Sequence, residues 1–394
     1  MNRHEKRVPT TSAVLRNAIF LASFPFGILM FALPIYGHRL GASALEIGGL
    51  FSAFSLMTVL LRPLVGRALD RYGRRWFLLL GLFSYAVAMI LFLLSSQVAM
   101  LYLARAAQGI GSALLWISAY SMVADLSPAE ARGGRFGRVD EASARGAMYG
   151  TFIGFTVLGF LGMSKGWTVL FGGYALLSFY ALWMAWRGIR ETRPPDPAQQ
   201  SNTNTKRPLS RQLIALMGIV FLTGASSALV RPLLMIFLQD HFSTEVDILA
   251  LAFLPSALIY SFLPSRMGRI GDRWGRKWPM MAGLLVSALV SLFLPNLSSL
   301  LWLILLWAIE ALGYTAATPA QEALVADLTG QERRGTAYGL YTFAASLGAV
   351  VGPLIGGWLY DAQGHAVPFY VNAAGLALSA VLIALFIRDQ LPGT

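Results

Sequence analysis

The chain has 394 residues, of which 56% are hydrophobic and only 13% are charged, and its mean hydropathy is +0.60. A soluble core cannot bury that much apolar surface, so most of the chain is expected to be solvated by lipid. The net charge of +12 favours a nucleic-acid partner only if the basic residues gather on a soluble surface. The lack of cysteine excludes disulfides, thiolate catalysis and cysteine-based metal sites.

Apolar segments alternate with short polar loops along the whole chain. Each is long enough to cross a hydrocarbon layer about 30 Å thick, which takes about 20 helical residues. The predicted spans are 14–37, 46–69, 76–95, 98–124, 133–159, 166–187, 212–239, 246–268, 277–296, 298–326, 335–360 and 367–388. The sequence therefore predicts an all-α integral membrane protein with twelve transmembrane helices.

The basic residues distinguish the two sides of the membrane. Arg39 and Lys165 fall in loops on one side, five arginines fall within spans, and the others lie at or beyond the opposite side. By the positive-inside rule that opposite side, with both termini, is the cytoplasm. This placement accounts for the net charge, so we expect no nucleic-acid partner, and the four histidines lack the spacing of a metal site. We expect a multi-pass protein of the cell (inner, cytoplasmic) membrane that keeps its first span.

Charge is concentrated in GRALDRYGRR, residues 66–75, between the second and third spans. GRIGDRWGRK, residues 268–277, repeats this pattern 202 positions later, and the same offset pairs the residues around Asp125 with those around Asp327. A single offset kept over such a distance indicates two homologous halves. The predicted organisation is a six-helix bundle at 1–187, a polar cytoplasmic linker at 188–211 and a second six-helix bundle at 212–394.

The two charged stretches, in matching loops of a six-plus-six membrane chain, resemble the loop motif of the major facilitator superfamily of secondary transporters. The resemblance covers nearly the whole chain and implies a lipid-embedded monomer that moves a small-molecule substrate through a site between its halves. The chain has no nucleophile–base set and no ATP-binding loop. We therefore expect no enzymatic activity and no cofactor, and transport driven by an ion gradient, with protons as the expected ion, or by the gradient of the substrate.

The charges of the two loops suit a conformational switch. Asp70 is expected to face the positive N-terminus of the eleventh helix, and Arg71 or Arg74 to pair with Asp125. The repeat predicts a mirror set in the second half. The complete gating set is Gly66, Asp70, Arg71, Arg74, Asp125, Gly268, Asp272, Arg273, Arg276 and Asp327. Anchoring by the positive-inside rule alone is the alternative, and it explains the arginines but neither loop aspartate.

The fourth helix contains RAAQGIGSA, residues 105–113, which is similar to a second motif of the superfamily that is common in proton-driven antiporters. Arg105 lies some seven residues into the span, where an arginine is costly unless it faces protein or a water-filled cavity. The resemblance implies that it influences proton exchange on a nearby acid, and Gln108 lies one turn further on. Snorkelling to the outer interface is the alternative.

The fifth helix is drawn into the membrane by its register with the eleventh, which starts it near Gly133. Arg138, Glu141 and Arg145 then share one helix face, with Asp140 beside them. We expect these charges to line a central cavity or to bridge to the other half. A long cytoplasmic helix end with solvated charges is the alternative.

Glu310 occupies the position in the second half that Gln108 occupies in the first. It follows Ser298 by twelve residues, or about 18 Å of helix, which places it near the midplane, where low polarity favours a protonated carboxyl group. We predict that Glu310 carries the proton. A structural pair with Arg231, beside Pro232 in the seventh helix, is the alternative.

The branch of the superfamily that this chain is closest to in its motifs is that of the drug/proton antiporters. Their fifth helix carries a Gly-Pro-x-x-Gly-Gly string, whereas this chain has GPLIGG in its eleventh helix and Thr151 at the matching place in the fifth. We expect proton-coupled efflux of amphipathic compounds. Proton-coupled uptake of an anionic metabolite, which the embedded arginines favour, and lipid flipping are the alternatives.

Overall fold

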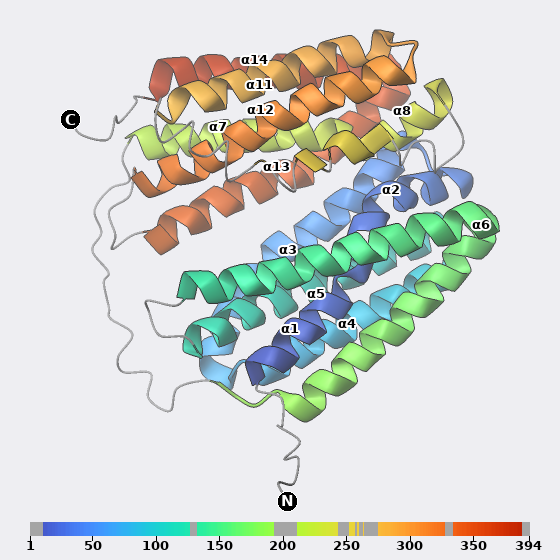
Figure 1. The fold of residues 1–394 in the computed structure, drawn as a ribbon, viewed down its shortest axis with the longest axis vertical. Coiled ribbons are helices and arrows are strands. Elements are labelled where there is room, and N and C mark those ends of the chain that lie inside the picture. Colours follow the sequence, from blue (N-terminus) through green and yellow to red (C-terminus); the bar gives the residue numbers. More distant parts are fainter. Residues whose placement is uncertain are drawn as a thin grey trace, which may run out of the picture. The chain divides into compact units, whose positions relative to one another are not determined.

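The computed structural model describes residues 11–126, 132–192, 211–242, 252–256, 258–259, 263, 275–327 and 334–387. The regular structure in this part of the chain is helical throughout (Figure 1). The helices are α1 (Thr11–Ala22), α2 (Phe24–Arg39), α3 (Ala44–Tyr72), α4 (Arg75–Leu93), α5 (Val98–Asp125), α6 (Arg132–Gly188), α7 (Arg211–Val230), α8 (Leu234–His241), α11 (Lys277–Phe293), the 3-10 turn η3 (Leu294–Asn296), α12 (Leu300–Asp327), α13 (Arg334–Gln363) and α14 (Val367–Phe386).

Ten helical stretches among the described residues are long and apolar enough to cross a membrane. The stretch Arg138–Gly188 has 51 residues, which would extend about 77 Å as one straight helix. It is interrupted at Gly162, whose φ of 69° lies in the region that glycine adopts most easily, and Figure 1 shows α6 turning back on itself. α6 therefore supplies two crossings. The predicted span 246–268 lies mostly outside the described residues, and the protein is a multi-pass membrane protein.

Two of the spans are interrupted next to a proline. α1 and α2 meet at Ser23, just before Pro25, and α7 and α8 are separated by a turn at residues 231–233 that contains Pro232. Proline lacks the N–H group that a helix interior needs, so these breaks follow from the sequence. By contrast, Pro34 lies inside α2 without ending it.

The chain divides into two compact units, and α3 contributes to both. Unit 1 contains residues 1–40 and 56–204, and unit 2 contains residues 41–55 and 205–394. Each unit has its own apolar core, built around Leu15, Leu82 and Leu115 in unit 1 and around Leu216, Met280 and Leu376 in unit 2. The expected linker 188–211 is described only as far as Thr192 and again at Arg211.

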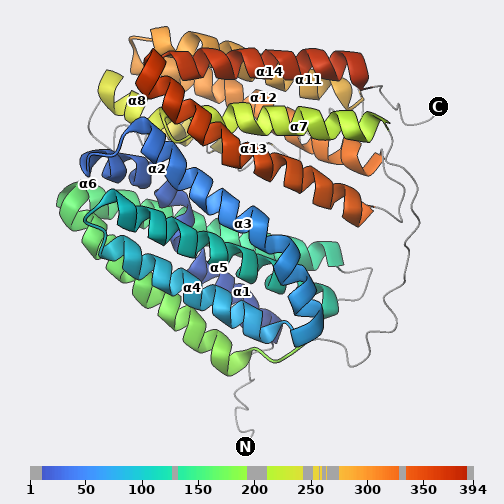
Figure 2. The ribbon, with the colours of Figure 1, turned by 180° about the vertical axis from the view of Figure 1, so that it is seen from behind.

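In unit 1, α1, α2 and α4 pack against α6, and α4 also packs against α5 (Figure 2). Glycines of α6 bring its backbone against α1 and α2. A methyl group placed on Gly146 would lie 2.1 Å from the carbonyl oxygen of Phe20, and one on Gly150 would lie 2.0 Å from that of Phe24. These helices approach so closely because the contact positions carry no side chain.

In unit 2, glycines of α13 allow the same close approach to the backbone of α7. A methyl group on Gly352 would lie 2.3 Å from the carbonyl oxygen of Ala225, and one on Gly356 would lie 2.0 Å from that of Leu229. These two glycines are the partners, at the 202-residue offset, of Gly150 and Gly154 in α6. The repeat therefore extends to the contacts that hold equivalent helices together.

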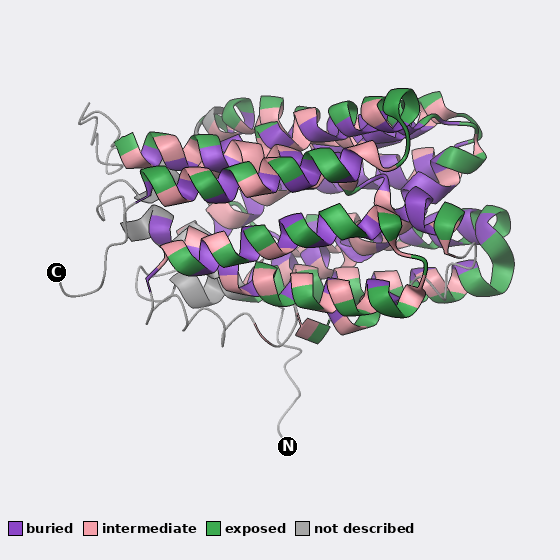
Figure 3. Cartoon of the chain, turned by 90° about the horizontal axis from the view of Figure 1, so that it is seen from above, coloured by how far each residue is buried: buried purple, intermediate pink, exposed green. Residues whose placement is uncertain are grey.

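The surface of each helix bundle is rich in large apolar side chains. Phe160, Leu176 and Leu385 are mostly exposed, and Figure 3 shows helices with exposed residues along one side and buried residues along the other. In water such surfaces would be a liability, but hydrocarbon chains solvate them as well as a protein interior does.

Candidate functional site

The first charged loop forms a tight turn between α3 and α4. α3 ends at Tyr72, Gly73 has a φ of 92°, and α4 begins at Arg75. In unit 2, Gly275 holds the matching position of the second motif and has a φ of 84°. The two copies of the motif therefore share the backbone conformation for which glycine is suited.

Arg74 is the arginine that pairs with Asp125. Its side chain is 5% exposed, its Nε donates to Asp125 Oδ2 at 3.2 Å, and its Nη1 donates to the carbonyl oxygen of Leu69 at 2.6 Å. Thr192 donates its hydroxyl to the same carboxylate oxygen at 3.1 Å. Arg71, the other candidate, is exposed and lies over the ring of Tyr72. The ends of α3, α5 and α6 are thus joined at one carboxylate.

Glu191 completes the same turn, and sequence reasoning placed it in the linker. Its carboxylate accepts the backbone N–H of Arg74 at 2.8 Å and that of Arg75 at 3.0 Å, where α4 has no side-chain cap of its own. A carboxylate satisfies the free N–H groups at a helix start and complements the dipole. A methyl group on Gly73 would lie 2.5 Å from the Glu191 carboxylate, so the glycine also makes room for this cap.

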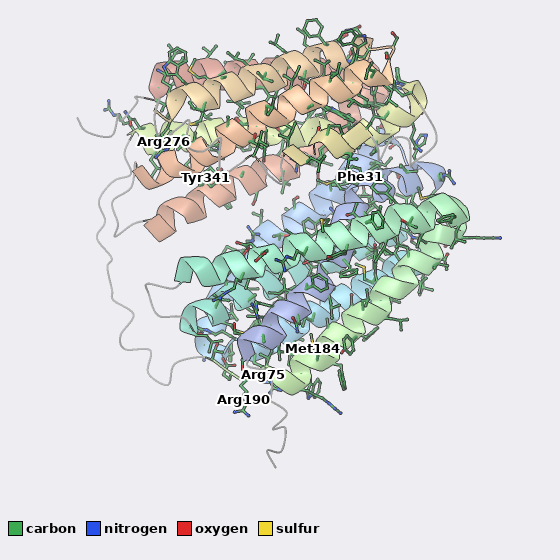
Figure 4. All side chains as sticks on the ribbon, in the orientation of Figure 1. Phe31, Arg75, Met184, Arg190, Arg276 and Tyr341 are labelled. Atoms are coloured by element: carbon green, nitrogen blue, oxygen red, sulfur yellow. The ribbon has the colours of Figure 1, made fainter. Side chains whose placement is uncertain are left out.

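A basic side chain ties the start of the following helix to a helix end in both units. In unit 1, Arg75 donates to the carbonyl oxygen of Trp186 at 2.9 Å, and Figure 4 shows Arg75 and Arg190 at the same end of this unit. In unit 2, Lys277 donates to the carbonyl oxygen of Ala384 at 2.7 Å. The donors are equivalent in the repeat, since positions 75 and 277 differ by 202, and each acceptor lies two residues before the end of its helix.

The structure describes only some of the remaining residues of the predicted gating set. Gly66 lies within α3 and Arg276 directly precedes α11. Gly268, Asp272 and Arg273 lie outside the described residues, as do the side chains of Asp70 and Asp327. The predicted contacts of these aspartates with helix N-termini therefore stay predictions.

Arg105 is buried inside unit 1. It is 6% exposed, and its Nη1 donates to Gln108 Oε1 at 2.7 Å one turn along α5. It also interacts electrostatically with Tyr85 of α4, whose hydroxyl is hydrogen-bonded to Ser112 and Trp116. This burial disagrees with the alternative in which Arg105 snorkels to an interface. The arginine is part of a polar layer between α4 and α5.

The charges at the start of α6 divide into two groups. The fifth helix does begin near Gly133, since α6 starts at Arg132. Arg145 and Glu141 form an ion pair within the helix and are both exposed, and Arg138 is also exposed. Asp140 is exposed too, but it accepts the hydroxyl of Tyr120 on α5. Of these four predicted residues, Asp140 is the one whose side chain the structure brings against another helix.

Glu310 lies within α12 and is partly buried. The hydroxyl of Ser287 on α11 donates to its carboxylate, and Arg231 interacts with it electrostatically. Arg231 is exposed, and it lies in the turn between α7 and α8 and not inside a continuous helix. One turn before Glu310, the buried Trp307 stacks on Phe253 with ring centroids 4.3 Å apart. Glu310 thus interacts with a hydroxyl donor and with a cation at a helix break, and an aromatic pair lies one turn before it in α12.

The sequence model of a known protein family matches almost the whole chain. The model described as Major Facilitator Superfamily matches residues 17–217 and again residues 216–394. Multidrug resistance protein 1 of Bacillus subtilis (strain 168) is 25% identical over 385 residues, covering 96% of both chains. Tetracycline resistance protein, class B, of Escherichia coli is 27% identical over 383 residues, covering 93% of this chain and 92% of that protein. Quinolone resistance protein NorA of Staphylococcus aureus is 25% identical over 388 residues, covering 96% of both chains.

Solved structures share the fold at lower identity. A bacterial homolog of the human lysosomal transporter Spinster, in an inward-facing and occupied conformation, has a TM-score of 0.79 at 16% identity over 96% of this chain and 97% of that chain. The nucleoside transporter NupG has a TM-score of 0.75 at 14% identity over 96% of this chain and 100% of that chain. At such identity these likenesses establish the fold and not the substrate.

Proposed function

The chain belongs to the Major Facilitator Superfamily, and from this premise we propose that it exports amphipathic small molecules from the cell in exchange for protons. Membership of the family makes it a transporter and not an enzyme. Relatives named for resistance to several drugs, to tetracycline and to quinolones match over nearly their full length, which supports export of compounds of this kind. We place the protein in the cell membrane as a monomer, with its basic loops and both termini in the cytoplasm.

Glu310 is the residue that we propose to carry the proton. The observation that supports this role is its position within a membrane span, partly buried, beside the hydroxyl of Ser287 and within the electrostatic influence of Arg231. Burial favours the protonated form of such a carboxyl group, whereas its donor and its cation favour the charged form, so substrate binding that shifts this balance can release the proton. Because Arg231 lies in the turn between α7 and α8, a change at that turn would alter the charge balance at Glu310.

We propose a supporting role for the polar layer around Arg105. A buried cation that donates to an amide and interacts electrostatically with a tyrosine keeps a fixed positive charge in unit 1, in the position that Trp307 takes in unit 2. The charges that bear on proton binding would thus be divided between the two halves of the chain. We also propose the gating role of Arg74 and Asp125, because this pair joins helix ends that alternating access has to separate or turn, and the repeat extends the proposal to Asp70, Asp272 and Asp327.

The test is proton release on ligand binding. Purified protein is screened for thermal stabilisation by tetracycline and by a quinolone, and the stabilising compound is then added to weakly buffered protein near neutral pH. We expect the wild type to release protons and Glu310→Gln to bind the compound without release, since the amide has no proton to exchange. Asp240→Asn, which removes an exposed carboxylate at the end of α8, serves as the control and is expected to behave as the wild type. The absence of proton release from the wild type would exclude coupling through Glu310.

A further inference from the structure

The first turn of α3 is capped by a residue that is distant in the sequence. Ser43 and Glu46 form a local capping box, with Glu46 N–H to Ser43 Oγ at 3.2 Å and Ser43 N–H to the Glu46 carboxylate at 2.9 Å. The next two N–H groups, of Ala44 and Leu45, donate to Asp361 Oδ1 at 3.1 Å and Oδ2 at 2.8 Å. Asp361 is on α13, and all of these residues belong to unit 2. Every N–H group that a helix start leaves free is satisfied here, two of them by α13.

Below the cap, two further turns of α3 touch the backbone of α13. A methyl group on Gly48 would lie 2.0 Å from the carbonyl oxygen of Pro353, and one on Gly357 would lie 2.4 Å from a carbonyl oxygen in the first turn of α3. One turn further, Ser52 donates its hydroxyl to the carbonyl oxygen of Val350 at 2.6 Å. Small residues at four-residue spacing therefore let α3 lie directly on α13.

The other half of the chain has no equivalent acid. The 202-residue offset places Gly159 at the position of Asp361 and Phe155 at that of Gly357. A methyl group on Gly159 would have no neighbour within 4 Å. The cap is thus an addition to one repeat and is not part of the framework that both repeats share.

We propose that Asp361 is a detachable N-cap, a positioning residue that holds the first three turns of α3 on α13 and whose release frees this part of α3 during transport. Asp361 and Leu45 are both exposed, so water can replace the carboxylate at the N–H group of Leu45, whereas Ala44 is buried. Gly48, Ser52 and Gly357 make the helix contact beneath it with small side chains and backbone atoms. The inference is independent of the substrate and of proton coupling.

The experiment measures how often this contact opens. The chain has no native cysteine, so Ser52→Cys introduces a single thiol at a position that is 5% exposed. The rate of its reaction with a methanethiosulfonate reagent is compared in purified protein with and without Asp361→Ala. We expect Asp361→Ala to raise the labelling rate about tenfold, which corresponds to the loss of a typical N-cap. Hydrogen exchange at Ala44 and Leu45, measured with Ser52 intact, is expected to rise by a similar factor.

Two further variants keep the test decisive. Asp361→Asn retains one acceptor oxygen, so it should accelerate labelling less than Asp361→Ala, and it provides the measurement if the alanine variant does not fold. Gln363→Ala changes an exposed side chain of α13 two positions beyond Asp361 without removing a bond to α3, and it should leave the labelling rate unchanged. Equal labelling of wild type and Asp361→Ala, or an equal rise in Gln363→Ala, would overturn the proposal.

Discussion

At the scale of single residues, the structure decides between side chains that the sequence could not separate. Arg71 and Arg74 stand three positions apart in the same motif, and both were candidates for Asp125. The positive φ of Gly73 turns the chain between them, so that Arg74 points into the unit while Arg71 stays exposed. The conformation of Gly73 therefore explains why Arg74, and not Arg71, forms the buried pair with Asp125.

Arg74→Ala should strongly destabilise unit 1, because it leaves the Asp125 carboxylate without its buried cation and the Leu69 carbonyl without its donor. We expect a loss of about 3 kcal/mol in the free energy of unfolding, as for other broken buried pairs. Thermal unfolding in detergent, followed by tryptophan fluorescence, provides the measurement. Arg71→Ala is the matched control, and a loss as large as that of Arg74→Ala would show that burial of the pair is not the cause.

Residue partners that no motif or repeat connects were beyond prediction. Glu191 follows the sixth span directly and looks like the first residue of a polar linker, and its partner on α4 is more than 100 positions away. Ser287 carries no motif that would connect it to Glu310, and Tyr120 carries none that points to Asp140. Such contacts depend on how helices pack, which hydropathy does not specify.

At the scale of helices, the sequence was more informative. Hydropathy and the repeat predicted the spans and the start of the fifth helix near Gly133, where composition alone suggests a loop, and the helix starts at Arg132. The break of the seventh helix beside Pro232 is explained by the chemistry of proline. The close approach of α6 to α1 and α2 could be anticipated only from the spacing of its glycines.

Gly150→Ala tests this approach. Its methyl group would lie 2.0 Å from the Phe24 carbonyl oxygen, so α6 and α2 must separate, and overpacking of this kind costs about 1–3 kcal/mol. Gly159→Ala, on the same helix and with nothing near its methyl group, should instead stabilise the protein by up to about 1 kcal/mol through helix propensity. Relative to the wild type, the melting temperature should fall for Gly150→Ala and rise for Gly159→Ala. A stabilised Gly150→Ala would contradict the packing described here.

At the scale of the whole molecule, function is expected where the two homologous halves differ. The repeat keeps the loop glycines, the basic turns and the glycine contacts between helices. It does not keep Arg105 and Gln108, which become Trp307 and Glu310, nor does the first half have a counterpart of Asp361. Duplicated features serve the common framework, and the unmatched charges are the candidates for coupling and control.

Directional flux tests the central claim, proton-coupled export through Glu310, most directly. Proteoliposomes with an imposed pH gradient are given tetracycline or a quinolone at equal concentration on both sides, with protein-free liposomes as the control for passive trapping. Exchange for protons predicts that the compound accumulates on the side of lower pH, and that Glu310→Gln abolishes the accumulation. Accumulation on the side of higher pH, as expected for proton-coupled uptake, or an equal accumulation by Glu310→Gln, would contradict the account.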